Sequence, residues 1–523
     1  MTIVFYPLST ALVNAHPLNP VIDVGIVQRF GQNPSDRLSI SAPQGDRLTL
    51  VFEDSSGTKT IEAANLTLEV VRSPQPIALE ERVVLSTHRS FESAEDSGLI
   101  WQQRGIPVEL AQPGTWEVWA KRSVYPTPLL RRLLWQNLKS QGHDEVYLAS
   151  QVVQEKKQAA WVVNGYRYHR DSLRLKSGSG VIWVDQTPYP GTLHLQPNSY
   201  GTYTLVNGVT IEDYLRGVVP YEIGPSAPAA AVEAQAILAR TYALRNVRRF
   251  AIDRYQMCAD TQCQVYRGWL EPVSRADQAI RNTKGLVLTY DNALIDAVYS
   301  STTGGVTAAF EDVWNGTPRP YLQPVIDAIP GRWDLSQNPL SEEQNFRNFI
   351  RQTEGFYEVG WNYFRWQTTA SLEQLTSDLK AYLQKRKHPL ANFQTVLGLT
   401  VKKRALSGRV QQLEVQLQMP RDPSGQTQAG QTQDNPASLV LEKDQILQAL
   451  ESPNSILFYL DPILNNDRKL TGYNFVGGGY GHGVGLSQTG SYRLAELGWS
   501  SEQILKFYYT NSTLAPLETS LLD

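Results

Sequence analysis

The sequence predicts a mixed, multi-domain α+β protein, with β-rich modules at the N-terminus and an α+β core built around a central buried helix. Three observations lead to this prediction. The chain has 523 residues, which is too long for a single ordinary hydrophobic core. Residues 20–85 alternate between apolar and polar in short runs, as strands do. The Ala-rich stretch 229–253 carries small and apolar residues on several helical faces, so it is expected to be buried.

The overall composition excludes several classes of protein. The net charge is −3, so the chain lacks a basic footprint and no nucleic-acid partner is expected. The sequence contains no apolar run of about 18 residues, so no membrane span is expected. The 12 Trp and 25 Tyr residues suit binding to sugar rings, although most side chains of this kind fill hydrophobic cores.

Residues 1–20 are interpreted as the remnant of a signal peptide. The stretch MTIVFYPLSTALVNAHP has an apolar run with no basic residue before it. Val13, Asn14 and Ala15 then fit a small-residue cleavage site of the A-x-A type. The basic start of the signal would be truncated or missing, and an ordinary chain terminus is the alternative. We therefore expect an exported protein.

Three domains are expected after that segment. Residues 21–100 form a small β module, and residues 101–177 have the pattern of a β-α-β unit with one amphipathic helix. Residues 178–515 form the α+β core. An insertion is expected around 335–470, and its polar, low-complexity stretch 421–438 predicts a disordered loop.

Turn residues predict two hairpins inside the core. Asp291 and Asn292 separate two apolar runs, which is typical of a two-residue hairpin loop. Ser407 and Gly408 separate a second pair of alternating runs. The segment SSEQILKFYYTN predicts a last helix near the end of the chain.

A glycine-rich stretch, VGGGYGHGVGLSQTG, begins at Val476. A dinucleotide fingerprint would need a glycine where Leu486 stands, and a P-loop would need a lysine where Ser491 stands. We therefore exclude a phosphate-binding loop. The glycines on both sides of His482 let the backbone approach a ligand and adopt positive φ. The alternative is a tight turn in which His482 forms a hydrogen bond with the backbone.

Glu222, in RGVVPYEIGPSAP, is the main candidate for chemistry. It stands alone among apolar residues immediately before the long helix. Burial disfavours a charged carboxyl, so its pKa is expected to rise until it can hold a proton near neutral pH. A general acid needs that property. The helix N-terminus beyond it favours the carboxylate instead. The alternatives are that Glu222 caps the helix or pairs with an arginine.

Three other residues have both structural and functional interpretations. Arg240 lies on the Ala-rich helix, where it either pairs with a buried carboxylate or points into a site. Cys258 and Cys263 are the only cysteines. They form a disulfide in an exported protein, remain free thiols, or supply half of a zinc site whose other ligands lie far away in the sequence.

Four stretches in order along the chain together resemble the SpoIID/LytB family, which is named after stage II sporulation protein D. They are LRGVVPYEIGPSAPAAAVEAQAILARTYAL, CADTQCQVYRG, YSSTTGGVTAAFEDVWNGTPRPYLQPVID and GYGHGVGLSQTGSYRLAELGWSSEQILKFYYTNS. The resemblance covers roughly residues 180–515 and is similar to the long cyanobacterial versions. It implies a housekeeping role in the cell wall and an extracytoplasmic location, in the periplasm or cell wall.

The resemblance implies a peptidoglycan lytic transglycosylase. Such an enzyme cleaves the linkage between N-acetylmuramic acid and N-acetylglucosamine, prefers strands stripped of stem peptides, and leaves 1,6-anhydro ends. A glycosidase that uses water usually needs two carboxylates, whereas this reaction can use one. Glu222 matches the family's catalytic glutamate and is the expected acid and base. The Met-Pro that follows it in the family is Ile223-Gly224 here, which alters packing more than chemistry.

Five other positions match family motifs and are expected to bind the glycan strand. They are Arg240, Tyr321, His482, Ser487 and Gln488. For Arg240, the resemblance also allows a role in tuning the pKa of the catalytic carboxyl. Some relatives have a lysine directly after the motif that contains the tyrosine, where this chain has a glutamine, so a charged contact is expected to be absent.

The resemblance also carries alternatives. Members described as amidase enhancers stimulate an N-acetylmuramoyl-L-alanine amidase, so the main rival is a non-catalytic peptidoglycan-binding enhancer with a cell-wall amidase as partner. A two-carboxylate hydrolase is a third option. Some members bind zinc near the cysteines through a histidine that this chain lacks, so neither a metal nor a cofactor is expected. Residues 101–177 are faintly similar to a SPOR-like peptidoglycan-binding module.

Overall fold

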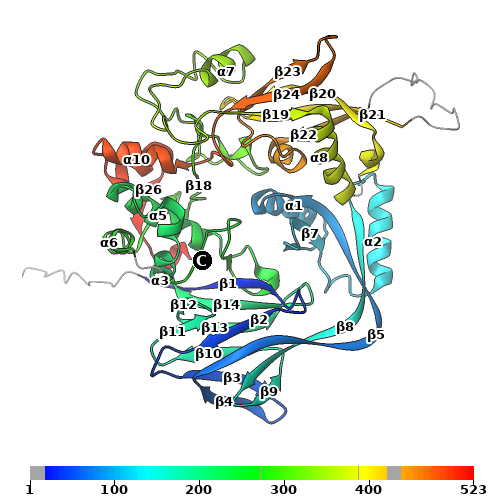
Figure 1. Ribbon diagram of the computed structural model, residues 1–523, viewed down its shortest axis with the longest axis vertical. Helices are drawn as coiled ribbons and strands as arrows, with labels where there is room; N and C mark the ends of the chain where they lie inside the picture. Colours follow the sequence, from blue (N-terminus) through cyan, green and yellow to red (C-terminus); the bar gives the residue numbers. More distant parts are fainter. Residues whose placement is uncertain (1–17, 271–272, 387, 421–436, 523) are drawn as a thin grey trace, which may run out of the picture.

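The chain folds into a mixed α+β structure, which confirms the predicted fold class (Figure 1). The computed structural model describes residues 18–270, 273–386, 388–420 and 437–522. Two predicted segments fall wholly or largely outside the described residues: the signal-peptide remnant up to residue 17, and the low-complexity loop from 421 to 436. Figure 1 shows a β-rich part at the bottom, a helical core at the left and further sheets at the top.

Two packed sheets form the β-rich part. One has the order β15-β1-β14-β13-β10-β3-β4, and the other has the order β12-β11-β2-β5-β7-β6, with β8 beside β5 and β9 beside β8. Alternate residues of a strand face the core, as Leu48, Leu50 and Phe52 do. The strands of this part are β1 (Val21–Phe30), β2 (Arg37–Ser41), β3 (Leu48–Asp54), β4 (Gly57–Ala63), β9 (Tyr166–His169), β10 (Leu173–Ser177), β11 (Val181–Val184), β12 (Thr187–Pro190), β13 (Thr192–Pro197), β14 (Tyr203–Thr210) and β15 (Met257–Cys258).

Two long antiparallel strands, β5 (Asn65–His88) and β8 (Tyr147–Val163), leave the β-rich part and continue along the right of Figure 1. Their register shifts between Pro74 and Ala78. Pro74 and Pro76 stand at this shift, and proline cannot donate a hydrogen bond to a neighbouring strand. The two halves of the strand pair therefore belong to two different units.

The second unit is a βαββαβ unit. Its chain order is β5, α1 (Phe91–Gln103), β6 (Val108–Ala111), β7 (Trp116–Ala120), α2 (Pro128–Ser140) and β8. The sheet order is β8-β5-β7-β6 with every neighbouring pair antiparallel, which is the split-βαβ arrangement of ferredoxin-like folds. Each helix begins at a hydroxyl side chain that accepts a backbone N–H, Ser90 for α1 and Thr127 for α2.

These units divide the N-terminal half differently from the predicted modules. The stretch 21–100, expected to hold strands alone, ends in helix α1. The predicted boundary at residue 177 falls inside a sheet, since β10 pairs with both β3 and β13. Strands of 173–210 thus complete a sandwich begun by 21–63. Local patterns reveal a strand but not its partner, because pairing joins residues far apart in the chain.

Helix α5 (Ala229–Arg245) is the central buried helix that the sequence predicts. All residues in 234–244 are buried. The helix is shorter than the predicted stretch, because the chain turns at Asn246, whose side-chain amide donates a hydrogen bond to the Tyr242 carbonyl at 2.9 Å. Five further helices surround it: α3 (Ile211–Arg216), α4 (Val219–Ile223), α6 (Ser274–Asn282), α10 (Gln488–Glu496) and α11 (Ser501–Tyr508).

Both predicted hairpins are confirmed. In the first, β16 (Leu286–Tyr290) pairs with β17 (Ala293–Leu294). Asp291 and Asn292 between them have φ of 50° and 57°, as a two-residue hairpin loop of this type requires. The second hairpin turns at Gly408, whose φ is 83°, and joins β20 (Thr395–Arg404) to β21 (Val410–Gln418).

The inserted region forms the upper part of Figure 1. Two three-stranded sheets, β19-β24-β23 and β20-β21-β22, pack with helices around them. The remaining elements of this region are α7 (Glu343–Ile350), β19 (Trp366–Ser371), α8 (Leu372–Lys385), β22 (Ala437–Glu442), α9 (Ile446–Ala449), β23 (Phe458–Leu464) and β24 (Leu470–Gly477). Strand β24 leads directly into the glycine-rich stretch. Among the described helices, none is long and apolar enough to cross a membrane.

Candidate active site

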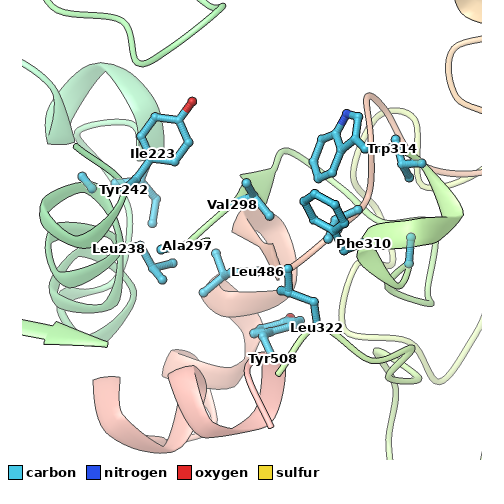
Figure 2. Close-up of a cluster of buried hydrophobic side chains, with 14 of the residues drawn as sticks. Ile223, Leu238, Tyr242, Ala297, Val298, Phe310, Trp314, Leu322, Leu486 and Tyr508 are labelled. Carbon is cyan, nitrogen blue, oxygen red and sulfur yellow. The ribbon is translucent and has the colours of Figure 1, made fainter. Parts of the chain in front are cut away.

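A cleft of about 530 Å³ lies between the helical core, the βαββαβ unit and the inserted region. Side chains distant in sequence line it, including Arg89, Glu222, Tyr299, Trp314, Asp444, His482 and Gln488. Figure 2 shows Tyr242, Val298 and Trp314, which also line the cleft, on three separate segments of the chain. Glu222 and His482 therefore lie in one cleft, although about 260 residues separate them in sequence.

A pair of short parallel strands joins two of the motif stretches. In it, β18 (Tyr299–Ser300) lies beside β25 (Leu486–Ser487). Glycine permits this approach: a Cβ atom on Gly485 would lie 2.0 Å from the Val298 carbonyl oxygen. Gly485 also has a φ of 75°, which favours glycine. At this position the glycine therefore serves packing between two protein segments.

Helix α10 holds the short helix that carries Glu222. The side-chain amide of Gln488 donates a hydrogen bond to the Glu222 carbonyl at 2.9 Å, and the Tyr492 hydroxyl donates one to the Ile223 carbonyl. These carbonyls belong to the last turn of α4, which lacks further intrahelical donors. The glycine-rich stretch and its helix thus fix the backbone of Glu222 rather than merely facing it.

The Glu222 carboxyl is half-buried and receives two hydrogen bonds. The Val265 N–H donates to Oε1 at 2.7 Å, and the Tyr299 hydroxyl donates to the same carboxyl group. Burial raises the pKa of Glu222, and these two hydrogen bonds only partly oppose it. Throughout the described parts of the chain, no Lys or Arg forms an ion pair with Glu222. The expected elevated pKa therefore has a structural cause, and the alternative of an arginine partner is wrong.

Buried polar side chains orient the Tyr299 hydroxyl. The Gln264 amide donates to the Tyr299 oxygen at 3.1 Å, and the Tyr214 hydroxyl donates to the Gln264 carbonyl oxygen at 3.2 Å. Because the Tyr299 oxygen already accepts one hydrogen bond, its own proton is directed to Glu222. Burial raises the pKa of Tyr299 well above its usual value, so the hydroxyl stays protonated.

His482 is held as a neutral ring at the cleft wall. Its Nδ1 accepts a hydrogen bond from the Val484 N–H at 3.0 Å, and its ring also forms a hydrogen bond with the Tyr299 backbone. Burial lowers the pKa of His482 to about 4. The ring packs against Trp314 with centroids 5.0 Å apart. His482 thus combines both predicted interpretations: it lines the cleft, and it braces a tight turn through the backbone.

Ser487 does not reach the cleft, which corrects its predicted contact with the glycan strand. Its side chain is fully buried, and its hydroxyl donates to the Glu358 carboxylate. It also caps α10 by accepting the Gly490 N–H at 3.1 Å. Glu358 in turn accepts the N–H groups of Thr303 and Gly305, at 2.6 and 2.7 Å. Ser487 is therefore part of a buried network behind the cleft.

Arg240 is also buried away from the cleft, so its predicted role as a glycan contact is wrong. Its guanidinium makes a two-fold contact with Glu212, through Nε to Oε1 at 2.9 Å and Nη2 to Oε2 at 2.8 Å. A third hydrogen bond reaches the Leu286 carbonyl at 3.0 Å. The structural pairing weighed for this arginine is the one observed.

Tyr321 likewise lies in the interior, contrary to its predicted place in the cleft. Its hydroxyl donates to Asp296 Oδ2 at 3.0 Å and accepts the Asp296 N–H at 3.1 Å. Arg245 and Arg319 pair with the same carboxylate. The tyrosine therefore completes an ion cluster that holds neighbouring segments together.

Cys258 and Cys263 form a disulfide, as expected for one of the three alternatives. Cys263 lines the cleft next to Val265, whose N–H binds Glu222. The bridge thus constrains the loop that orients the carboxyl. The donor set does not fit zinc, since both thiols are used in the bridge. Among the residues described, no group of three or more His, Cys, Asp or Glu side chains could hold a metal ion.

Sequence reasoning missed Tyr299, Trp314 and Arg89 as cleft residues. Tyr299 immediately precedes the hydroxyl-crowded stretch SSTTGG, and this aromatic residue next to a polar loop was the available signal. Trp314 follows in the same motif. Arg89 had no local signal, because it enters the cleft only through the packing of the βαββαβ unit against the core.

Comparison with known proteins gives two matching family models. One, described as Stage II sporulation protein, matches residues 199–290. The other, a domain of unknown function (DUF8618), matches residues 308–485. Glu222 and the disulfide fall in the first match, and His482 falls in the second.

Three curated relatives show where the similarity extends. The chain is 29% identical over 388 residues to the amidase enhancer of Bacillus subtilis, which covers 71% of this chain and 51% of that protein. It is 28% identical over 353 residues to an uncharacterized protein of Brachyspira hyodysenteriae, covering 66% of this chain and 77% of that protein. It is 29% identical over 174 residues to stage II sporulation protein D of Bacillus subtilis, covering 30% of this chain and 49% of that protein. The chain thus spans about half the length of both Bacillus subtilis relatives.

Proposed function

The chain belongs to the SpoIID/LytB family, and we propose that it is a peptidoglycan lytic transglycosylase that uses Glu222 as its single acid and base. One observation carries the proposal: Glu222 lines a large cleft with a raised pKa and without a cationic partner. A carboxyl in such surroundings holds a proton at a pH where an exposed glutamate has lost it. The substrate is a glycan strand, and the enzyme works outside the cytoplasm.

The reaction needs two proton transfers, and both pass through one carboxyl group. Protonated Glu222 donates to the glycosidic oxygen as the bond between that oxygen and C1 of N-acetylmuramic acid breaks. The carboxylate then accepts the proton of the C6 hydroxyl while O6 bonds to C1. The products are a free 4-hydroxyl on N-acetylglucosamine and a 1,6-anhydro end. Glu222 is protonated again, and no water is consumed.

Neighbouring groups support both steps. The Val265 N–H and the Tyr299 hydroxyl hold the carboxyl in place and stabilise its charged form between the two transfers. Gln488 fixes the backbone below it. The neutral His482 and Trp314 offer aromatic rings against which a sugar ring packs.

The test compares the wild type with Glu222→Gln on purified glycan strands without stem peptides. Mass spectrometry should detect 1,6-anhydro ends from the wild type. The rate of the variant should be lower by a factor of about 10²–10⁴, the usual contribution of a general acid. Glu233→Gln on α5, outside the cleft, is the matched control and should keep the wild-type rate. If the wild type gives no anhydro ends, the proposal fails.

Two other outcomes identify the alternatives. One relative is named amidase enhancer, which favours a non-catalytic binding protein as second candidate. In that case the chain yields no anhydro ends but accelerates a cell-wall amidase. A hydrolase would need a second carboxyl, and the cleft offers Asp444, whose pKa burial raises to about 6. In that case, products made in ¹⁸O-water carry the label on a reducing muramic end, and Asp444→Asn abolishes them.

A further inference from the structure

A second groove of about 460 Å³ adjoins the cleft. Arg89 and Gln262 line both cavities, so the two share a border. One wall of the groove comes from the βαββαβ unit and includes Gln112 and Thr115. The other comes from α8, the end of α9 and Glu451, and includes Tyr382. Figure 1 shows α8 close above α1 and β7. The groove therefore exists only because the N-terminal unit and the inserted region meet beside the core.

Three cationic side chains stand in the groove: Arg89, Lys385 and Arg386. Arg89 is exposed at the border with the cleft, and across the described chain no hydrogen bond or salt bridge engages its guanidinium, although the charge of Asp444 in the cleft acts on it. Lys385 is exposed at the last residue of α8. Arg386 lies 4.0 Å above the Tyr382 ring and donates to the Gln448 side chain, so its position is fixed without a carboxylate.

The two carboxylates of the groove, Asp378 and Glu451, balance only part of the charge of its three cations. Asp378 uses its carboxylate within the protein: Oδ1 accepts from the Gln374 amide at 2.6 Å, and Oδ2 accepts the Glu451 N–H at 3.1 Å. Glu451 is exposed, and its carboxylate makes no ion pair with the described residues. The groove therefore keeps an excess of positive charge on a concave surface, which favours an anionic ligand.

We propose that this second groove binds the carboxylate groups of a glycan strand whose catalytic linkage lies in the cleft. The inference rests on the proposed function and adds a ligand chemistry to it. Removal of stem peptides by amide hydrolysis leaves a free lactyl carboxylate on every N-acetylmuramic acid. A strand that continues past Arg89 presents these anions to Arg386 and Lys385, and the arginine fork matches the planar carboxylate.

The test measures binding with the full-length Glu222→Gln variant, so that no strand is consumed. Long peptide-free strands are compared with the same strands whose lactyl carboxylates have been converted to methylamides. At low salt the neutral methylamide strands should bind about tenfold more weakly than the charged strands. Added salt should reduce this difference in affinity. Equal affinity for the two strands overturns the proposal. Strands that keep their stem peptides distinguish the two sources of carboxylate: tighter binding to them than to peptide-free strands overturns the lactyl assignment.

Charge-removing variants locate the site. Arg89→Gln and the double change Lys385→Gln with Arg386→Gln should each lower affinity for the charged strand and leave affinity for the neutral strand unchanged. Lys403→Gln, an exposed lysine on β20 outside the groove, is the matched control. If the groove variants behave like the control, the site is not this groove. These results are independent of turnover, so 1,6-anhydro ends from the wild type still decide the proposed function separately.

Discussion

Two glutamates on consecutive short helices beside α5 differ in what surrounds them. Glu212 on α3 pairs with the fully buried Arg240 in a two-fold contact and also accepts the Gly285 N–H. Glu222 on α4 has hydrogen-bond donors but no cation, and it faces a cleft. The first contact joins two elements of the core. The second leaves a carboxyl whose proton affinity is raised.

A half-buried glutamate becomes available for chemistry when its partners are neutral. An arginine stabilises the carboxylate strongly enough to keep it ionised. Hydrogen bonds from Val265 and Tyr299 orient the carboxyl, yet burial still dominates its pKa. Both residues are glutamates on short helices that contact α5, so the charge of the partner is what distinguishes them.

The largest expected loss of stability comes from removing Arg240, the cationic partner of Glu212. Arg240→Met leaves Glu212 charged in a mostly buried position, since only 12% of its side chain is exposed. Breaking a buried pair on one side costs about 3–5 kcal/mol of unfolding free energy. Chemical denaturation should therefore show a large loss of stability, while the pKa of Glu222 and the activity per folded molecule stay unchanged.

A double variant and a surface control sharpen this result. Adding Glu212→Gln to Arg240→Met removes the uncompensated charge and should restore part of the lost stability. Arg281→Met, on the exposed side of α6, should cost little. A wild-type denaturation midpoint for Arg240→Met would show that the pair is not structural.

Asp327 is a carboxyl that has no contact with solvent and no cationic partner among the described residues. Asp327 is fully buried beside Glu358 and accepts the Tyr508 hydroxyl at 2.8 Å. Burial, and next the neighbouring Glu358, raise its pKa well above 3.8. Below pH 3.8 the Asp327 carboxyl is protonated in both the folded and the unfolded chain, and its contribution to the free energy of unfolding is complete. As the pH rises from 3.8 toward the raised pKa of the folded state, that contribution is lost.

The slope of that loss is about 1.4 kcal/mol per pH unit for one group. Asp327→Asn replaces the neutral acid with a neutral amide. The free energy of unfolding of this variant should therefore fall less steeply with rising pH than that of the wild type. Melting temperatures measured across that range test this, with the exposed Asp467→Asn as control. A variant curve parallel to that of the wild type would contradict the protonated state of Asp327.

The smallest expected effect concerns Tyr299, which tunes the unpaired glutamate. Its hydrogen bond lowers the pKa of Glu222, so Tyr299→Phe should raise that pKa further. A general acid acts while protonated, so the alkaline limb of kcat/KM should move to higher pH, by up to about one unit. Tyr290→Phe, outside the cleft, should leave the pH profile in place. A shift toward lower pH would show that the Tyr299 hydroxyl does not stabilise the carboxylate.

Local sequence patterns were enough to predict most of the core elements and the candidate acid. The fold class, the central helix, both hairpins and the isolation of Glu222 among apolar residues follow from local patterns, because periodicity and turn chemistry act over a few residues. The two cysteines, close in sequence, offered a disulfide that the structure contains. Gln488 and His482, which motif resemblance singled out, both line the cleft.

Only the tertiary structure decided which polar residues face the cleft and which hold the core. Arg240, Tyr321 and Ser487 look equally suited to binding in the sequence, yet each is buried against a partner from another element. Arg89 reaches the cleft only because the βαββαβ unit packs beside α5 and α8. The physical reason is common to all four: a side chain's partners are set by contacts between segments far apart in the chain, which no local pattern encodes.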